Sequence, residues 1–318
     1  MKNRECDGEA LEIEPEVDLK VVIDEKKNYI LNEISSKKSK GHIWTLSPII
    51  LWLLAFLTVP LMIVIALGFF TRGMYGGIEF KLTLSNYIRM INPIYIDILL
   101  KSLGLSLLST VLCLGFGYPF AYFLTKAPRK YRTALFLLII IPFWTNSLVR
   151  TYAWITLLRT GGLINSYLLK LHIISAPLTL LYTDGAILLG LVYTLFPFMV
   201  LPLYSSIESI DKGYIEAAND LGANKWRAFC KITIPLSIPG IVAGCILVFI
   251  PTLGYFFIPD LMGGGRTMYI SNIIKNQFLT ARNWPFGSAT SIVVIALTIA
   301  LIGFYLKITK GKTLGEVV

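Results

Sequence analysis

The sequence predicts an all-α membrane protein with six transmembrane helices. Of its 318 residues, 55% are hydrophobic and only 15% are charged, and the mean hydropathy is +0.68. Soluble globular domains carry about 25% charged residues, so this composition is typical of a polytopic membrane protein. Six apolar stretches are long enough to cross a hydrocarbon layer about 30 Å thick. They cover residues 43–70, 102–125, 134–158, 185–206, 238–258 and 288–306.

Residues 1–40 differ in kind from the rest of the chain. They hold ten of the 19 acidic residues and contain no apolar run. They do not resemble a signal peptide, because the first apolar stretch begins only after residue 42. We interpret this segment as a mostly disordered cytoplasmic extension with a short helix around 16–31, and residues 41–318 as the membrane domain. A regulatory or partner-binding role for the extension stays open.

The six stretches predict a tightly packed helical bundle. Proline falls within five of them, and each proline frees a backbone carbonyl that lipid cannot satisfy, so neighbouring helices or lining water must do so. In the fifth stretch, Pro251 and Gly254 predict a break. Arg150 is the single formal charge within the stretches. These prolines include Pro48, Pro60, Pro119, Pro142, Pro197, Pro239 and Pro251.

Positive charges predict the orientation in the membrane. Lysine and arginine gather before the first stretch, in the short loop between the second and third, and after the last. Positively charged loops stay on the cytoplasmic side, so both termini and the loop 207–237 are expected there. The net charge of +10 is then a topology signal and not a nucleic-acid footprint. The residues are Lys37, Lys38, Lys40, Lys126, Arg129, Lys130, Arg132, Lys307, Lys310 and Lys312.

The loop 207–237 contains a polar, helix-prone segment, GYIEAANDLGANKWRAFCKITIP. We predict two short helices, with Asp211 capping the first and Asn224 capping the second. Gly222 suits the sharp turn between them, and Pro235 is expected to end the second helix. An amphipathic loop lying on the lipid surface is the alternative, but such a helix has no need for glycine at this spacing.

The same segment carries a spaced motif. Glu216-Ala217-Ala218 is followed after three residues by Gly222, and after nine more by Ile232-Thr233-Ile234-Pro235. This pattern resembles the EAA loop of bacterial ABC importer permeases, which reads E-A-A, three residues, G, nine residues, I-x-L-P. The resemblance implies a type I importer permease (MetI-like) fold and a cytoplasmic loop that docks onto a separate ATPase. The implied coupling residues are Glu216, Ala217, Ala218, Gly222, Ala223, Lys225 and Arg227.

Further blocks make the resemblance more specific. From about residue 44 to the end, the chain resembles the spermidine/putrescine permeases of these importers. The blocks that carry this likeness are Pro142–Arg150 (PFWTNSLVR), Leu195–Val200 (LFPFMV), Pro202–Glu208 (PLYSSIE), Asp260–Gly264 (DLMGG) and Asn283–Gly287 (NWPFG).

A polyamine path needs groups that replace water around ammonium ions, namely carboxylates and aromatic faces. It should contain only a few such groups, because many fixed anions would trap the substrate. The path candidates are Trp144, Asn146, Tyr152, Tyr255, Phe256, Phe257 and Asp260. Each has an alternative: aromatic residues also form interfacial belts, and Asp260 could cap a short helix after Pro259. For Arg150 we favour an ion pair with an acid of a partner permease, or snorkelling to the outer surface, over substrate contact.

The resemblance also implies the partners. They are a second homologous permease, two copies of an ABC ATPase, an extracytoplasmic polyamine-binding protein and the lipid bilayer of a bacterial cell membrane. No nucleic acid is expected, because the basic residues are accounted for by the topology, and no metal is expected, because His42 and His172 are isolated. This chain is not expected to be an enzyme: Gly311-Lys312-Thr313 lacks the first glycine of a phosphate-binding loop, since position 306 is Leu306. ATP-Mg would bind the ATPase alone. An importer permease for another small solute, and an ATP-independent secondary transporter, remain alternatives.

Overall fold

The computed structural model describes residues 41–74 and 76–313, so the predicted extension 1–40 and its helix lie outside the described residues. The chain divides into two units, Met1–Met62 and Ile63–Val318. α2 (Gly41–Leu53) continues through a π-helical turn, η1 (Leu54–Thr58), into α3 (Val59–Gly68), and the boundary between the two units falls within α3. The wide π turn stands directly before Pro60, where it relieves the clash between a proline ring and the preceding helical turn.

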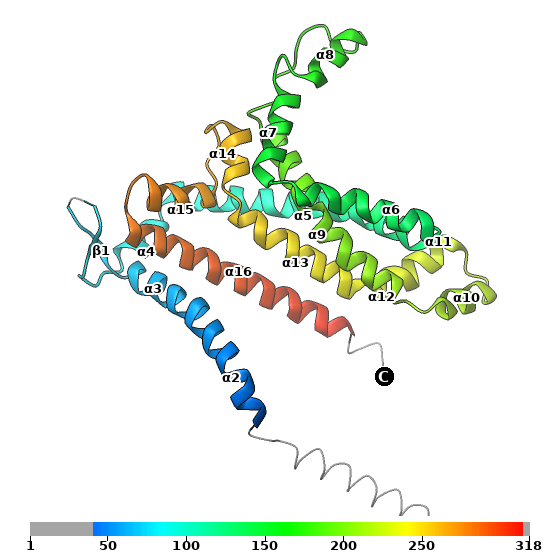
Figure 1. Ribbon diagram of the computed structural model, residues 1–318, viewed down its shortest axis with the longest axis horizontal. Coiled ribbons are helices and arrows are strands. Elements are labelled where there is room, and N and C mark those ends of the chain that lie inside the picture. Colours follow the sequence, from blue (N-terminus) through cyan, green and yellow to red (C-terminus); the bar gives the residue numbers. More distant parts are fainter. Residues whose placement is uncertain (1–40, 75, 314–318) are drawn as a thin grey trace, which may run out of the picture. The chain divides into compact units, whose positions relative to one another are not determined.

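Three helices form the core of the second unit. They are α5 (Pro93–Lys126), α9 (Asp184–Glu208) and α13 (Ile238–Gly254), which pack side by side (Figure 1). Their buried side chains meet in one apolar cluster that includes Cys113 of α5, Met199 of α9 and Val248 of α13. Lipid tails are as apolar as these side chains, so close van der Waals packing holds the helices together.

Two glycines set the distance between α13 and α9. A side chain at Gly240 would collide with Ser206 and with the carbonyl oxygen of Pro202, at 2.7 Å. A side chain at Gly244 would meet the sulfur of Met199, also at 2.7 Å. The spacing of four residues places both glycines on one face of α13, a small-residue pattern that lets helix backbones approach closely.

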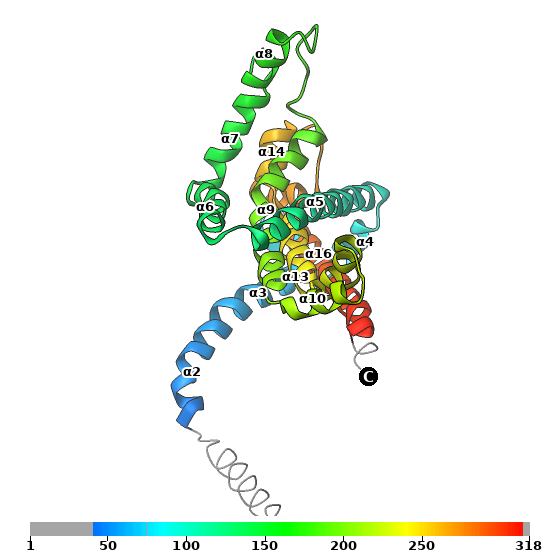
Figure 2. The ribbon, with the colours of Figure 1, turned by 90° about the vertical axis from the view of Figure 1, so that its right-hand side faces the viewer.

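The third predicted stretch is not a single helix. It consists of α6 (Arg129–Ile140), a 3₁₀ turn η2 (Ile141–Trp144) and α7 (Ser147–Leu158), followed by α8 (Leu163–Lys170). The chain bends by 98° between the two halves (Figure 2). The expectation of one continuous helix over 134–158 is therefore wrong. At Pro142 the α-helix gives way to the 3₁₀ turn, and Thr145 is extended. The Asn146 side chain then accepts the Leu148 N–H at 2.9 Å and starts α7 anew.

The fifth predicted stretch ends early, as Pro251 and Gly254 suggested. α13 stops at Gly254, Tyr255 is extended, and a short helix α14 (Phe257–Gly263) follows. The helix predicted to run to residue 258 is thus four residues too long. A loop then leads to α15 (Ile270–Leu279) and to the last helix, α16 (Trp284–Thr313).

A smaller apolar cluster joins α15 and α16 to α4 (Ser85–Met90) through Met90, Ile270, Ile273 and Phe286. The β1–β2 hairpin (Thr71–Arg72 with Ile78–Glu79) lies ahead of α4. By length and composition, four helices of the described residues can cross a membrane, or six if each bent pair counts as one span. This result agrees with the predicted fold class; the orientation of the termini stays a prediction.

Candidate coupling surface and transport path

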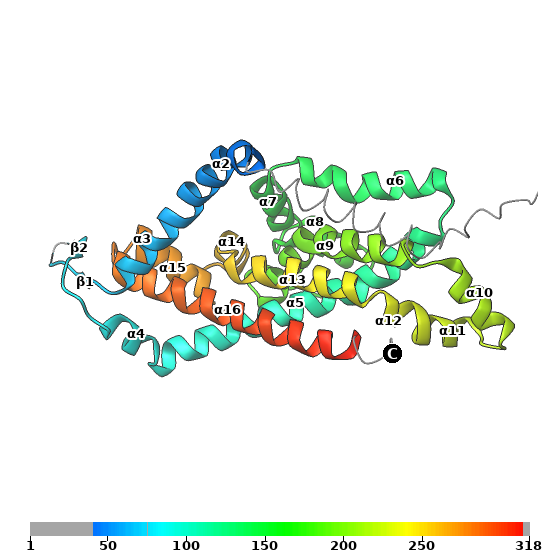
Figure 3. The ribbon, with the colours of Figure 1, turned by 90° about the horizontal axis from the view of Figure 1, so that it is seen from below.

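The predicted two-helix loop is present at the end of the bundle where α5 and α9 finish (Figure 3). α10 (Lys212–Asp220) and α11 (Lys225–Ala228) flank a turn at Gly222, whose φ is +83°. The Asp211 side chain accepts the Gly213 N–H at 2.9 Å, and the Asn224 side chain accepts the Arg227 N–H at 2.7 Å. Both predicted caps and the left-handed turn are confirmed.

The end of the second helix differs from the prediction. α11 continues through a π-helical segment, η3 (Phe229–Thr233), into α12 (Ile234–Leu236), so the helix passes through Pro235 and ends at Leu236, with Ser237 as its C-cap. The wide π turn accommodates the proline ring, as η1 does before Pro60. Ser237 is buried and its hydroxyl bonds to the Tyr118 hydroxyl at 2.9 Å, which ties the end of this helix to α5.

The coupling residues predicted from the motif lie on or just beneath the loop surface. Five of them are exposed: Glu216, Ala217, Gly222, Lys225 and Arg227. Ala218 and Ala223 are half-buried. The surface also presents large apolar side chains, since Leu221 is 90% and Trp226 is 72% exposed, and Tyr214 is exposed too. These three were not among the predicted coupling residues, although apolar side chains in a polar loop are a signal that could have found them.

A polar cavity of about 360 Å³ lies between this loop and the ends of α5, α6 and α9. Glu216 and Lys225 contribute to its wall, together with Arg132 and Glu208. Arg132 forms an ion pair with Glu208 and donates to the carbonyl oxygen of Thr125 at 2.9 Å. The structure therefore places a charged network directly beneath the predicted coupling residues, from parts of the chain that the motif does not cover.

The first group of path candidates surrounds the break before α7. Trp144 is 82% exposed, Tyr152 is exposed, and Asn146 caps α7. It is the neighbouring Trp154 that packs inward, edge to face with Tyr193 at 5.5 Å. α7 itself lies against α14, which carries Phe257 and Asp260 of the second group of candidates (Figure 2).

The second group surrounds the break after α13. The Tyr255 and Phe257 rings meet edge to face at 5.2 Å, and the Phe256 and Phe257 rings at 6.1 Å. Side chains of α15 satisfy the interrupted backbone: Ser271 donates to the Tyr255 carbonyl at 2.9 Å and Asn272 to the Phe256 carbonyl at 3.0 Å.

Asp260 lies in the first turn of α14 and does not cap that helix. Its carboxylate accepts a hydrogen bond from Asn272 and forms an ion pair with Lys275 of α15. Lys275 was not identified from the sequence, because fifteen residues separate it from Asp260 and no local spacing connects them.

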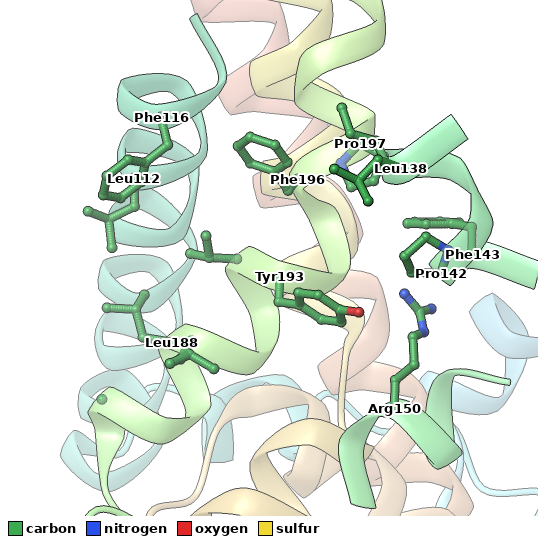
Figure 4. Close-up of a pocket in the computed structure, with 14 residues that line it drawn as sticks. Leu112, Phe116, Leu138, Pro142, Phe143, Arg150, Leu188, Tyr193, Phe196 and Pro197 are labelled. Atoms are coloured by element: carbon green, nitrogen blue, oxygen red, sulfur yellow. The ribbon is translucent and has the colours of Figure 1, made fainter. Parts of the chain in front are cut away.

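Arg150 points into a cavity of about 530 Å³ between α5, α6 and α9 (Figure 4). Its guanidinium carbon lies 4.8 Å from the centre of the Phe143 ring and 6.0 Å from that of Tyr193. Its Nε is buried and has no hydrogen-bond partner among the described residues. Aromatic faces thus hold this cation within the chain; the predicted pairing with a partner's acid stays a prediction.

The described part of the chain holds no group of three His, Cys, Asp or Glu side chains that could bind a metal ion. Its four long apolar helices and two bent helix pairs define a multi-pass membrane protein with a structured polar loop at one end. Residues 114–311 match the family model described as the binding-protein-dependent transport system inner membrane component. The chain belongs to this family, and it is a permease subunit of a binding-protein-dependent importer.

Relatives of known identity narrow the comparison. The spermidine/putrescine transport system permease protein PotB of Escherichia coli (strain K12) is 49% identical over 243 residues, which cover 76% of this chain and 88% of that protein. PotB of Haemophilus influenzae is 44% identical over 266 residues, covering 84% and 93%. The inner membrane ABC transporter permease protein YdcU of E. coli is 30% identical, covering 70% and 75%. The resemblance to spermidine/putrescine permeases is confirmed.

Two solved structures share the fold. A bacterial ABC transporter involved in the import of the acidic polysaccharide alginate matches with a TM-score of 0.67 over 92% of this chain and 98% of that one. The alginate transporter in complex with its alginate pentasaccharide-bound periplasmic protein matches with a TM-score of 0.68, over 90% and 95%. Both are 18% identical in sequence, so this likeness confirms the predicted importer permease fold and says nothing about the solute.

Proposed function

We propose that this chain is one of two permease subunits of a bacterial ABC importer that carries polyamines, spermidine or putrescine, into the cell. The observation that carries the proposal is the 49% identity to PotB of E. coli over 243 residues. The chain itself would bind no nucleotide, and the energy would come from two copies of a separate ATPase that bind ATP-Mg.

The loop 207–237 would be the surface on which the ATPase docks. Glu216 and Gly222 would shape it, and Ala223, Lys225 and Arg227 would lie at the contact. The exposed Leu221 and Trp226 support this assignment, because a protein interface gains most from burying large apolar and aromatic side chains. Closure of the ATPase dimer would push on this loop, and rigid-body rocking of the bundle would alternate access to the two sides of the membrane.

The remaining partners follow from the same proposal. The loop and both termini would be cytoplasmic, in the inner membrane of a bacterial cell. An extracytoplasmic binding protein would deliver the polyamine to the opposite side, where α8, α14 and α15 would lie. A second homologous permease would complete the path along the interface between the two subunits.

The path would offer few and weak sites to the ammonium groups. The aromatic residues Tyr255, Phe256 and Phe257 with Asp260 form one candidate group, and Trp144, Asn146 and Tyr152 form the other. Aromatic faces attract ammonium by about 0.5–2 kcal/mol each, which is enough to replace part of its hydration without trapping it.

Uptake of labelled spermidine into proteoliposomes tests the proposal. The vesicles should hold this chain with its neighbouring permease, ATPase and binding protein. ATP-dependent uptake that putrescine competes with, and that sulfate and thiamine do not affect, is the expected result. ATP hydrolysis stimulated by the binding protein without polyamine transport would assign the importer to another solute. Uptake independent of ATP would overturn the coupling proposal.

A further inference from the structure

A groove separates α5 from α6 next to the turn that joins these two helices. A cavity of about 580 Å³ lies there, and its walls include Phe123 and Lys126 of α5 and Tyr131, Leu135 and Leu138 of α6. Phe123, Tyr131 and Leu138 are 61%, 62% and 68% exposed, respectively. The groove is therefore mostly apolar and open to the surroundings of the protein.

The groove continues along the two helices. Leu138 also lines the cavity of about 530 Å³ into which Arg150 points, so the two hollows adjoin (Figure 4). Phe116 of α5 belongs to the second hollow and is 64% exposed. From Phe116 to Lys126 the helix rises by about 15 Å, at about 1.5 Å per residue. This length is half of a hydrocarbon layer about 30 Å thick, which is the depth of one acyl chain.

A cation stands at the end of the groove that lies next to the turn. Lys126 is exposed, and its ammonium lies 4.2 Å from the centre of the Tyr122 ring. No carboxylate of the described residues forms an ion pair with it. The turn adds further positive charge, because residues 126–132 hold four bases and no acid. Lysine and tyrosine side chains at the edge of the hydrocarbon layer lie beside lipid headgroups.

We propose that this groove binds one anionic phospholipid, with an acyl chain between α5 and α6 and the phosphate at Lys126. The charge decides between the possible occupants. A transmembrane helix of a partner subunit matches the apolar walls alone, whereas a phospholipid matches the walls with its acyl chain and the cation with its phosphate. Basic pockets between transmembrane helices are known to bind anionic headgroups. The inference holds for any transported solute and does not rest on the proposed function.

The headgroup site lies next to the two-helix loop. Lys126 also lines the polar cavity of about 360 Å³ beneath that loop. The Tyr122 ring under its ammonium meets the Phe229 ring of η3 edge to face at 4.9 Å. The lipid phosphate is thus one side chain away from the segment that joins α11 to α12. A bound lipid therefore stabilises the junction of α5, α6 and the loop.

Lipid retention by the purified importer tests the proposal. The complete importer is stripped of lipid in detergent and titrated with phosphatidylglycerol or phosphatidylcholine, and bound lipid is counted by mass spectrometry of the intact complex. We expect phosphatidylglycerol to be retained at about 3- to 10-fold lower concentration than phosphatidylcholine, and to raise the melting temperature. Lys126→Gln should remove this preference, and Lys126→Arg should keep it. Lys170→Gln, at an exposed lysine that does not line the groove, is the matched control and should behave as the wild type.

Filling the groove gives a second test that leaves the charge unchanged. Leu138→Trp places a larger side chain where the acyl chain lies and should lower the retention of phosphatidylglycerol. Ala134→Leu, in the wall of the same cavity, serves as the second variant if Leu138→Trp does not fold. Leu108→Trp, at an exposed position of α5 that does not line the groove, is the control and should retain the lipid.

Three outcomes overturn the proposal. The first is equal retention of the two lipids by the wild-type importer. The second is an equal loss of phosphatidylglycerol from Lys126→Gln and Lys170→Gln, which would indicate attraction to surface charge in general. The third is a groove covered by a helix of the second permease: Leu138→Trp would then weaken assembly of the importer, and Lys126→Gln would leave lipid retention unchanged.

Discussion

Arg132, in the first turn of α6, forms an ion pair with Glu208, the last residue of α9. The same guanidinium donates to the carbonyl of Thr125 at the end of α5, at 2.9 Å. One side chain therefore connects the ends of three helices directly before the two-helix loop begins at Asp211. We expect a displacement of that loop to reach α5, α6 and α9 through this point.

Arg132→Gln and Glu208→Gln should reduce uptake per ATP hydrolysed more than they reduce stability. Partly exposed ion pairs contribute only about 0–1 kcal/mol to folding, so the expected effect lies in alignment of the loop. ATPase activity and spermidine uptake are measured on the same proteoliposomes. The exposed Lys130→Gln is the control for loss of a nearby charge. An unchanged ratio of uptake to hydrolysis in both variants would contradict the prediction.

Gly222→Asp should abolish uptake and leave membrane insertion intact. A Cβ at this position meets no atom within 4 Å, so the substitution causes no clash. It costs about 1–2 kcal/mol because the residue has φ +83°, and it adds a negative charge at the exposed turn. Gly222→Asn introduces nearly the same shape without the charge and should keep more of the uptake. Equal activity of the two variants would show that charge at the docking surface is unimportant.

Gly240→Ala and Gly244→Val should destabilise the bundle by about 1–3 kcal/mol each, or more, because a side chain there collides with α9. Thermal unfolding in detergent is the measurement. Gly115→Ala on α5 is the matched control, since its Cβ would meet no atom within 4 Å. A melting temperature in the Gly240 variant as high as in the control would contradict the close approach of α13 to α9.

Tyr269 should make the protein sensitive to alkaline pH. Burial, and then its hydrogen bond to Asp184 at 3.0 Å, raise the pKa of Tyr269 from 10.0 to about 12. The folded state thus holds the phenolic proton more tightly than the unfolded chain. Its contribution to stability is complete below about pH 10 and is lost as the pH rises towards about 12. In detergent melts, Tyr269→Phe should be less stable near neutral pH and should lose less stability over this interval. Parallel pH profiles would contradict the assignment.

The sequence predicted those features that depend on neighbours along the chain. Hydropathy located the membrane-crossing segments, because any apolar run of this length is stable in lipid wherever it packs. Asp211, Gly222 and Asn224 defined the loop, because helix caps and left-handed turns are set by local backbone chemistry. The interval between motif residues was sufficient to predict the family.

The tertiary structure decided what depends on residues distant in sequence. At the break after Pro142 the chain bends by 98°, and α7 beyond the bend packs against α14, which is distant in the sequence. Arg132 meets Glu208 across 76 positions, and Lys275 meets Asp260 across fifteen. A charged side chain is available to a ligand only if the fold does not bring an opposite charge of the same chain to it. Composition and spacing therefore determined the kind of membrane protein, whereas only the packed bundle revealed that the candidate carboxylate already holds a cation of its own chain.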